Sequence, residues 1–280
     1  MDAVILLNKP VGMTSFDAVA KCRRIFHERK IGHTGTLDPE ASGLMIILLG
    51  KYTKLLPYCV KNHKAYQATL KLGEMTDTED IWGTIINTKT PSIHTEAEID
   101  NAVQSLTGDI LQVPPMYSAL KKDGKKLYEY ARQGIKIERE ARPVHISTLE
   151  VEKIDETNYR MNAVVSSGTY IRTLITDFGE QLDELAIMSS LIRTKIEHLS
   201  LKDACTFEDL ESGVSFLSPI QVIDPTYKIV ETDRVVDIKN GKRIKLDIRD
   251  PQVIFTSNGE LLAAYALQED GLYHCLRGLF

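Results

Sequence analysis

Two short apolar segments, residues 3–8 (AVILLN) and 44–49 (LMIILL), limit most strongly what this chain can fold into. Uncharged runs of this length are typical of β-strands that are buried on both faces, and they are too short to cross a lipid bilayer. Residues 15–26 lie between them and have a helical pattern, for which Thr14 or Ser15 is the expected N-cap. The N-terminal part therefore predicts two buried strands and a helix.

The middle of the chain adds half-buried strands and further helices in no regular order. Strands are indicated by alternation of apolar and polar residues, and helices by threonine caps and apolar stripes. The expected elements are strands at residues 65–73, 83–87, 144–156 and 159–168, and helices at 95–108 and 169–185. Because strands and helices do not alternate regularly, an α+β fold is favoured over a doubly wound parallel sheet.

The character of the sequence changes between Pro219 and Pro225. Short strand patterns follow, and the dipeptides between them are strong hairpin signals. These dipeptides are Asn240-Gly241, Asn258-Gly259 and Asp270-Gly271. We therefore expect a small β-rich domain at residues 225–280, after a larger domain at residues 1–224.

Composition indicates an ordinary globular protein. Hydrophobic residues make up 43% and charged residues 26%, close to the average for soluble domains. The N-terminus has no basic leader, so a cytoplasmic location is expected. The cysteines Cys22, Cys59, Cys205 and Cys275 form no CxxC pair, which favours reduced, buried thiols over a zinc site or a disulfide framework.

Charge is distributed unevenly along the chain. The net charge of −5 argues against a protein that coats nucleic acid indiscriminately. Residues 120–143, however, contain eight Lys or Arg against four acids, whereas acids gather in residues 73–83. Either run alone is usually just a solvated face, but together they predict a polarised surface that steers a polyanion to one side.

Residues 32–43 (GHTGTLDPEASG) form a pliable loop that carries one acid, Asp38. Gly32, Gly35 and Gly43 permit unusual backbone angles and close approach of another chain. Phosphate-loop, zinc-protease and serine-elbow motifs are absent, which leaves metal-assisted and serine chemistry without support. From these residues alone, Asp38 before Pro39 is either an ordinary turn former or a candidate catalytic acid.

Five longer segments change that balance. They occur in the order typical of one family, and the resemblance that they carry covers the chain from residue 3 to about residue 195. The segments are residues 7–19, 32–45, 64–83, 114–132 and 166–182. Together they resemble the TruB-type tRNA pseudouridine-55 synthases, bacterial enzymes that isomerise one uridine in the T-loop of transfer RNA to pseudouridine. The resemblance implies a mixed, largely antiparallel central sheet flanked by helices, with a small C-terminal PUA-like RNA-binding domain.

The same resemblance implies a role for individual residues. Asp38 is the nucleophile or the acid/base, Tyr66 stacks on the target uracil, and Arg172 lies beside the aspartate. His33, Tyr170 and Leu191 contact the substrate, and Lys9, Pro10, Gly32 and Gly35 support the active-site loop. Attack of Asp38 at C6 of the uracil, attack at C1′ of the ribose, and a glycal intermediate all stay open, as does a role of Tyr66 as a base.

The residue types agree with these roles. A base inside a folded loop must be extruded before it can react, and aromatic and apolar contacts offset the cost of unstacking. A carboxylate in a dry pocket tends to take up a proton, and the permanent charge of Arg172 is expected to hold Asp38 ionised. An isomerisation needs no redox cofactor, nucleotide or metal.

Residues 115–143 match the RNA-gripping insertion of this family, which is often called a thumb. A short helix is expected near residues 126–134, and Tyr128 and Tyr130 are expected to pack beneath the basic side chains. The expected contacts to RNA phosphates come from Lys121, Lys122, Lys125, Lys126 and Arg132. The expected partner is the T-arm of transfer RNA, bound by a monomer and without a membrane.

One stretch departs from the family pattern. Ile192, Glu197 and Leu199 stand where relatives commonly have arginine, glycine and phenylalanine, so the backbone after Leu191 is open to a different course. Three other functions remain as alternatives: a non-catalytic tRNA-binding or folding module, a synthase acting on another RNA, and a glycoside hydrolase. The last needs a second acid near Asp38, for which Asp177 and Glu180 are the candidates.

Overall fold

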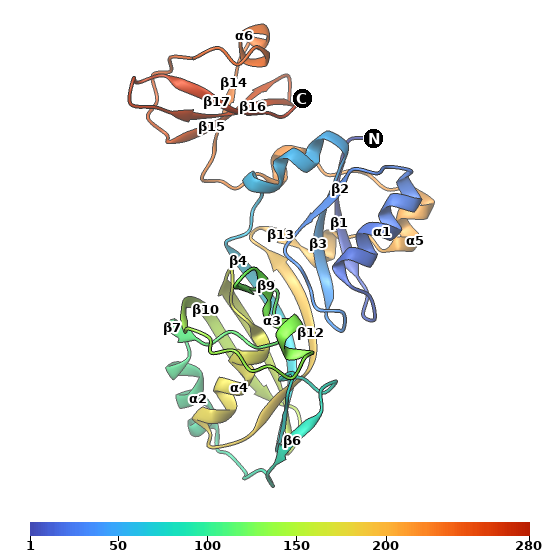
Figure 1. Cartoon of the computed structure of the whole chain (residues 1–280), viewed down its shortest axis with the longest axis vertical. Coiled ribbons are helices and arrows are strands. Elements are labelled where there is room, and N and C mark those ends of the chain that lie inside the picture. The colour runs from blue at the N-terminus through green and yellow to red at the C-terminus, as the bar shows by residue number, and fades with distance from the viewer. The chain divides into compact units, whose positions relative to one another are not determined.

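The computed structural model describes residues 1–280, which form two compact units. The first unit comprises Met1–Lys61 and His198–Phe280, and the second comprises Asn62–Glu197 (Figure 1). None of the helices combines the length and the apolar character needed to cross a membrane. The domain border expected at residue 225 falls inside the first unit, whose C-terminal part has a sheet and a core of its own.

The N-terminal strands are buried as predicted. β1 (Ala3–Lys9) runs antiparallel to β3 (Ser42–Leu49) along its whole length, and β2 (Ile31–Thr34) also pairs with β3. Residues 44–49 of β3 are completely inaccessible to solvent. The helix α1 (Ser15–Phe26) follows β1, and Thr14 is its N-cap. The remaining elements of the first unit before residue 225 are η1 (Gly50–Tyr58), β13 (Leu199–Ser200), η2 (Leu201–Asp203), α5 (Phe207–Ser212) and η3 (Pro219–Val222).

The C-terminal sheet has the order β14-β15-β16-β17, around a core that includes Phe255, Tyr265 and Tyr273. Its first pair of strands is parallel and the other two pairs are antiparallel. The elements are β14 (Lys228–Glu231), α6 (Val235–Lys239), β15 (Gln252–Ser257), β16 (Glu260–Leu267) and β17 (Tyr273–Gly278). The prediction of a small β-rich region is therefore confirmed.

The hairpin predictions hold at two of the three dipeptides. Asn258-Gly259 connects β15 to β16, with φ angles of 51° and 78° that suit a two-residue hairpin. Asp270-Gly271 lies in the turn between β16 and β17. The prediction for Asn240-Gly241 is wrong, because Asn240 is the C-cap of α6 and Gly241, with φ 68°, follows it. The residue after a helix often adopts the left-handed conformation that a hairpin turn also requires, so glycine is common at both places.

The second unit contains a sheet in the order β12-β4-β11-β10-β7, in which every neighbouring pair is antiparallel. Its strands are β4 (His63–Leu72), β7 (Gly108–Gln112), β10 (Arg142–Lys153), β11 (Asn158–Ser166) and β12 (Ala186–Ile196). The helices α2 (Glu96–Ser105) and α4 (Ile171–Gln181) pack against each other and against this sheet (Figure 1). The unit also contains two small hairpins. One pairs β5 (Glu74–Thr76) with β6 (Ile85–Thr88), and the other pairs β8 (Lys121–Lys122) with β9 (Lys125–Lys126). This architecture confirms the predicted α+β class.

The prediction of four buried thiols is only half right. Cys22 and Cys59 are buried, and burial raises the pKa of each thiol to about 12. Cys205 is only half-buried. Cys275 is exposed, because β17 is an edge strand of the C-terminal sheet and this residue lies in its exposed stretch. No disulfide joins any of them.

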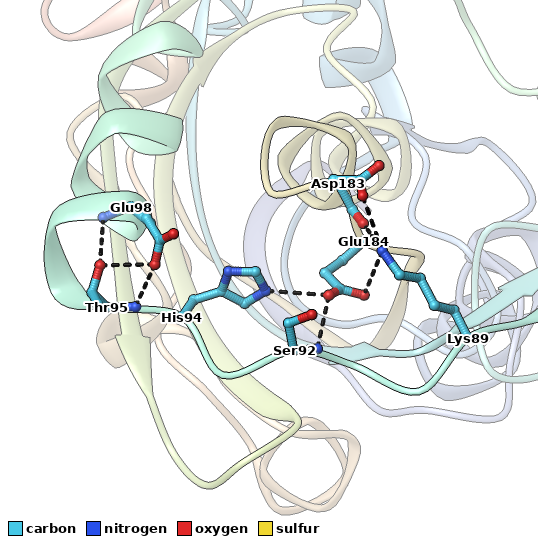
Figure 2. A network of polar contacts seen from close by, with 7 residues as sticks. All are labelled: Lys89, Ser92, His94, Thr95, Glu98, Asp183 and Glu184. Carbon is cyan, nitrogen blue, oxygen red and sulfur yellow. Dashed lines mark hydrogen bonds and ion pairs between the residues drawn. The ribbon is translucent and has the colours of Figure 1, made fainter.

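A buried carboxylate connects the segment before α2 with the turn after α4 (Figure 2). Glu184, 4% exposed, accepts a hydrogen bond of 2.8 Å from the Ser92 N–H. Its two carboxylate oxygens also lie 3.4 Å from Nε2 of His94 and 3.6 Å from Nζ of Lys89. Burial favours the neutral form, but these donors outweigh it and leave the pKa of Glu184 below its usual value of 4.5.

We expect Glu184→Ala to lower the free energy of unfolding by about 2 kcal/mol, because the Ser92 N–H loses a buried charged acceptor and His94 and Lys89 each lose an ion-pair contact. The contribution is present above about pH 4.5 and is lost as pH falls through the lowered pKa of the folded state. Urea unfolding at pH 7 and pH 4 measures both effects. Asp183→Asn is the matched control, since this exposed carboxylate, 3.2 Å from Lys89, should contribute less than about 0.5 kcal/mol. Equal losses in the two variants would contradict the assignment.

Candidate active site

The residues expected in the site belong to both compact units. The first unit contributes Lys9, Pro10, Gly32, His33, Gly35 and Asp38. The second contributes Tyr66, Lys121, Lys122, Lys125, Lys126, Arg132, Tyr170, Arg172 and Leu191. Within each unit, these residues have their own contacts.

The loop that carries Asp38 is fastened on its N-terminal side by Ser15. The Thr14 side chain accepts a hydrogen bond of 3.0 Å from the Asp17 N–H and so caps α1. Ser15 is therefore not the helix cap, and its hydroxyl bonds elsewhere. The buried Ser15 hydroxyl donates to the Leu37 carbonyl at 3.1 Å and accepts the Leu37 N–H at 2.9 Å. Sequence reasoning missed this function, because both residues are good helix caps.

Lys9 fastens the other side of the same loop. Its ammonium group is fully buried and donates to the carbonyls of Pro10 and Met13, both at 2.8 Å, and of Pro39 at 3.2 Å. The Gly12 N–H donates to the same Pro39 carbonyl at 2.9 Å. A buried ammonium is costly unless it is hydrogen-bonded, so these carbonyls are what stabilises Lys9 in this position. The backbone is thus held immediately before and after Asp38, whose side chain is half-buried.

The two glycines expected to support the loop, Gly32 and Gly35, differ in their local geometry. Gly35 has φ 66°, a conformation that L side chains rarely adopt. Gly32 lies within β2, where a Cβ atom would come within 2.9 Å of the end of the Leu56 side chain, so a larger residue there would require Leu56 to shift. His33 is its neighbour in β2, opposite Ile47 of β3.

Tyr66 and Leu191 lie on one face of the sheet in the second unit. Leu191 on β12 is opposite Ala68 of β4, and residues two apart on a strand point to the same side. Leu191 is buried, and Tyr66 is half-buried. β11 ends at Ser166, opposite His63 at the start of β4. The helix α4, which follows β11 after a short turn, therefore begins at the end of the sheet where Tyr66 lies.

Tyr170 and Arg172 form the beginning of α4, as predicted. Tyr170 is the N-cap position, and Arg172 is the second helical residue. Arg172 is only 5% exposed, and its two terminal nitrogens donate to the carbonyls of Thr78 and Tyr117, both at 2.9 Å. These bonds fix the orientation of the guanidinium plane. The partners could not be recognised in the sequence, because backbone carbonyls leave no residue signature.

Two acids beside the start of α4 have a raised pKa. Burial raises the pKa of Glu79, although the Thr173 hydroxyl, which donates to it at 2.8 Å, and the Arg172 charge act in the opposite direction. Burial and the carboxylates of Glu180 and Glu79 raise the pKa of Asp177 to about 7. A carboxyl group that is half-protonated at neutral pH is a candidate proton donor. The Gln112 side chain acts in the opposite direction and lowers the pKa of Asp177.

Several basic side chains of the thumb lie over aromatic rings. Lys121 and Lys126 face each other across the β8–β9 hairpin, and the helix α3 (Leu127–Ala131) follows, shorter than predicted. The contacts between cations and rings are Lys126 to Tyr128 at 5.4 Å, Arg132 to Tyr128 at 5.3 Å and Lys125 to Tyr130 at 4.7 Å. The expected packing of the tyrosines beneath the basic side chains is therefore observed.

The stretch that departs from the family pattern begins within β12, whose pairing with β4 shifts register between Arg193 and Lys195. β12 continues to Ile196, and Glu197 then has φ 51°, the left-handed region that glycine favours. The Glu197 carboxylate accepts the His63 N–H at 2.8 Å and lies 3.2 Å from Nδ1 of the same residue. These bonds offset part of the cost of placing a side chain in this conformation.

The chain is similar to known proteins over most of its length. The profile described as TruB family pseudouridylate synthase (N terminal domain) matches residues 23–171. A protein named tRNA pseudouridine synthase B from Oceanobacillus iheyensis is 40% identical over 280 residues, which cover 95% of this chain and 92% of the relative. A protein of the same name from Clostridium perfringens is 48% identical over 249 residues, which cover 87% and 85%.

A solved structure also resembles the chain. One chain of the structure described as a Cbf5-Nop10-Gar1 complex superposes with a TM-score of 0.71, over 99% of this chain and 85% of that one. The two sequences are 24% identical, so this likeness supports the fold alone.

Proposed function

Because the chain belongs to the TruB family of pseudouridylate synthases, we propose that it isomerises a uridine of transfer RNA to pseudouridine, at position 55 in the T-loop. The observation that carries this proposal is the match, over nearly the whole chain, to relatives named tRNA pseudouridine synthase B. In the reaction, the bond between N1 and C1′ breaks and a bond between C5 and C1′ forms. The proton on C5 leaves and N1 gains one, so no oxidant or co-reactant is needed.

Asp38 is the residue that we propose acts on the flipped nucleotide. The bonds from Ser15 to Leu37 and from Lys9 to Pro39 support this role, because they hold the backbone on both sides of the carboxylate. A group fixed in this way loses little conformational freedom when the substrate arrives.

Arg172 is proposed to keep Asp38 ionised through a paired, charge-assisted hydrogen bond. Its guanidinium is already oriented by the carbonyls of Thr78 and Tyr117, which supports a role that depends on direction as well as on charge. Tyr66 is proposed to stack on the extruded uracil, and the side chains of His33, Tyr170 and Leu191 to contact the substrate around it.

Release of tritium tests the reaction directly. A tRNA transcript labelled with tritium at C5 of its uridines should lose the label of one uridine per molecule, and a transcript with cytidine at position 55 should lose none. Binding without release would favour the non-catalytic module instead. Release from ribosomal RNA but not from tRNA would favour a synthase for another RNA.

We further propose that residues 1–224 form the catalytic domain and residues 225–280 a PUA-like RNA-binding domain. Support for the second domain comes from its separate sheet and core. Its basic cluster, residues 239–245 (KNGKRIK), is partly neutralised within the domain, since Lys242 lies 2.7 Å from Asp237 and Arg243 lies 3.7 Å from Asp270. We therefore assign most of the phosphate binding to the thumb, in a monomer that works in the cytoplasm.

We expect the double variant Lys121→Gln, Lys126→Gln to raise KM for tRNA about tenfold and to flatten its salt dependence, with kcat changed less than about twofold. Both lysines lie on the β8–β9 hairpin, and they supply charge for phosphate groups rather than reacting groups. Steady-state kinetics at three salt concentrations measures the effect. Lys153→Gln, an exposed lysine at the end of β10, is the control. An unchanged KM and salt slope would contradict the assignment of the thumb.

A further inference from the structure

Gln112 is a buried amide that neither the reaction nor the sequence motifs account for. It is the last residue of β7, just before the thumb, and is 2% exposed. Its Oε1 accepts the Tyr170 N–H at 2.8 Å, and its Nε2 donates to the Tyr170 carbonyl at 3.1 Å. A single side chain thus pairs with both backbone polar groups of one residue that lies 58 positions away.

This pairing resembles that between neighbouring β-strands, in which the N–H and the carbonyl of one residue are both hydrogen-bonded. Tyr170 is the N-cap position of α4, yet its own side chain makes no capping hydrogen bond. Helix starts need such partners, because their first N–H groups have none within the helix. Gln112 therefore orients the peptide groups on both sides of the Tyr170 Cα atom, and with them the direction in which this side chain leaves the backbone.

The same short segment also holds Arg172. The carbonyl of Tyr117, five residues after Gln112, accepts Nη2 of Arg172 at 2.9 Å. The segment that enters the thumb is thus fastened to α4 at Tyr170 and Arg172.

We propose that Gln112 is a positioning residue, which sets the start of α4 so that Tyr170 and Arg172 meet the flipped uridine in a reactive arrangement. This inference rests on the function proposed above. Small displacements of positioning groups cost rate, with about 1 Å corresponding to a factor of about one hundred. A purely structural role, in which the amide only satisfies two buried backbone groups, predicts a loss of stability without a loss of rate in the folded molecules.

Two variants of nearly the same shape test the proposal. Gln112→Glu keeps an acceptor for the Tyr170 N–H but loses the donor to its carbonyl, and Gln112→Met removes both. The matched control is Gln181→Met, at the other end of α4, where an exposed amide accepts the Ser105 hydroxyl at 3.1 Å. The readout is the single-turnover rate constant for tritium release at saturating excess of the full chain over labelled tRNA, together with Kd and the melting temperature.

Under these conditions inactive molecules do not lower the rate constant, so it reports the geometry of the folded ones. We expect both Gln112 variants to react at least about tenfold more slowly, with Kd within about twofold and the control unchanged. An unchanged rate constant with a lower melting temperature would overturn the proposal in favour of a structural role. A raised Kd at an unchanged rate would overturn it in favour of a thumb anchor. If the unsubstituted chain releases no tritium, the proposed function itself has failed.

Discussion

Replacing Asp38 by alanine is expected to lower the rate of pseudouridine formation by about 10⁴-fold or more, since removal of an essential reacting group typically costs that much. The loop should survive the change, because Ser15 and Lys9 hold it through backbone atoms of Leu37 and Pro39. We therefore expect the Kd for tRNA and the melting temperature to stay close to those of the unsubstituted chain.

Tritium release in single-turnover experiments measures this effect, and Asp38→Asn should behave in the same way because it keeps the shape without the charge. Glu40→Gln is the matched control, an acid two residues further along the same loop, and it should react at nearly the normal rate. Residual release above about one percent of normal in Asp38→Ala would mean that another group carries the reaction.

The main elements of the fold could be predicted because their signals are local. The apolar runs of β1 and β3 and the threonine cap of α2 each identify an element from its own residues. Prediction from local signals fails where the same residues are compatible with two different local structures. Asn240-Gly241 has the composition of a hairpin turn but ends a helix, and Thr14 and Ser15 are equally good caps.

The candidate site was predicted only in part, for a physical reason. The motifs point to residues whose side chains we propose react or bind, such as Asp38 and Arg172. The groups that hold those side chains are mostly backbone carbonyls, such as those of Thr78 and Tyr117, or an amide such as Gln112 whose partner is far away in the sequence. No periodicity or spacing marks such contacts, because they depend on how strands and helices pack.

Arg172→Lys is expected to lower the single-turnover rate by a factor of about one hundred or more, since removing one preorganised donor from an active site typically costs that much. A lysine ammonium is a point charge that cannot reproduce the planar fork oriented by Thr78 and Tyr117. Arg160→Lys is the matched control, an exposed arginine on β11 that binds Glu152 at 3.0 Å, and it should leave the rate unchanged.

The melting temperature and the Kd for tRNA separate a role of Arg172 in the reaction from a structural one. A lower rate with both quantities unchanged would support the role in the reaction. A lower rate together with a lower melting temperature would instead mean that the lysine variant merely misplaces the segments of Thr78 and Tyr117. Near-normal turnover would mean that Arg172 and Asp38 do not act as a pair.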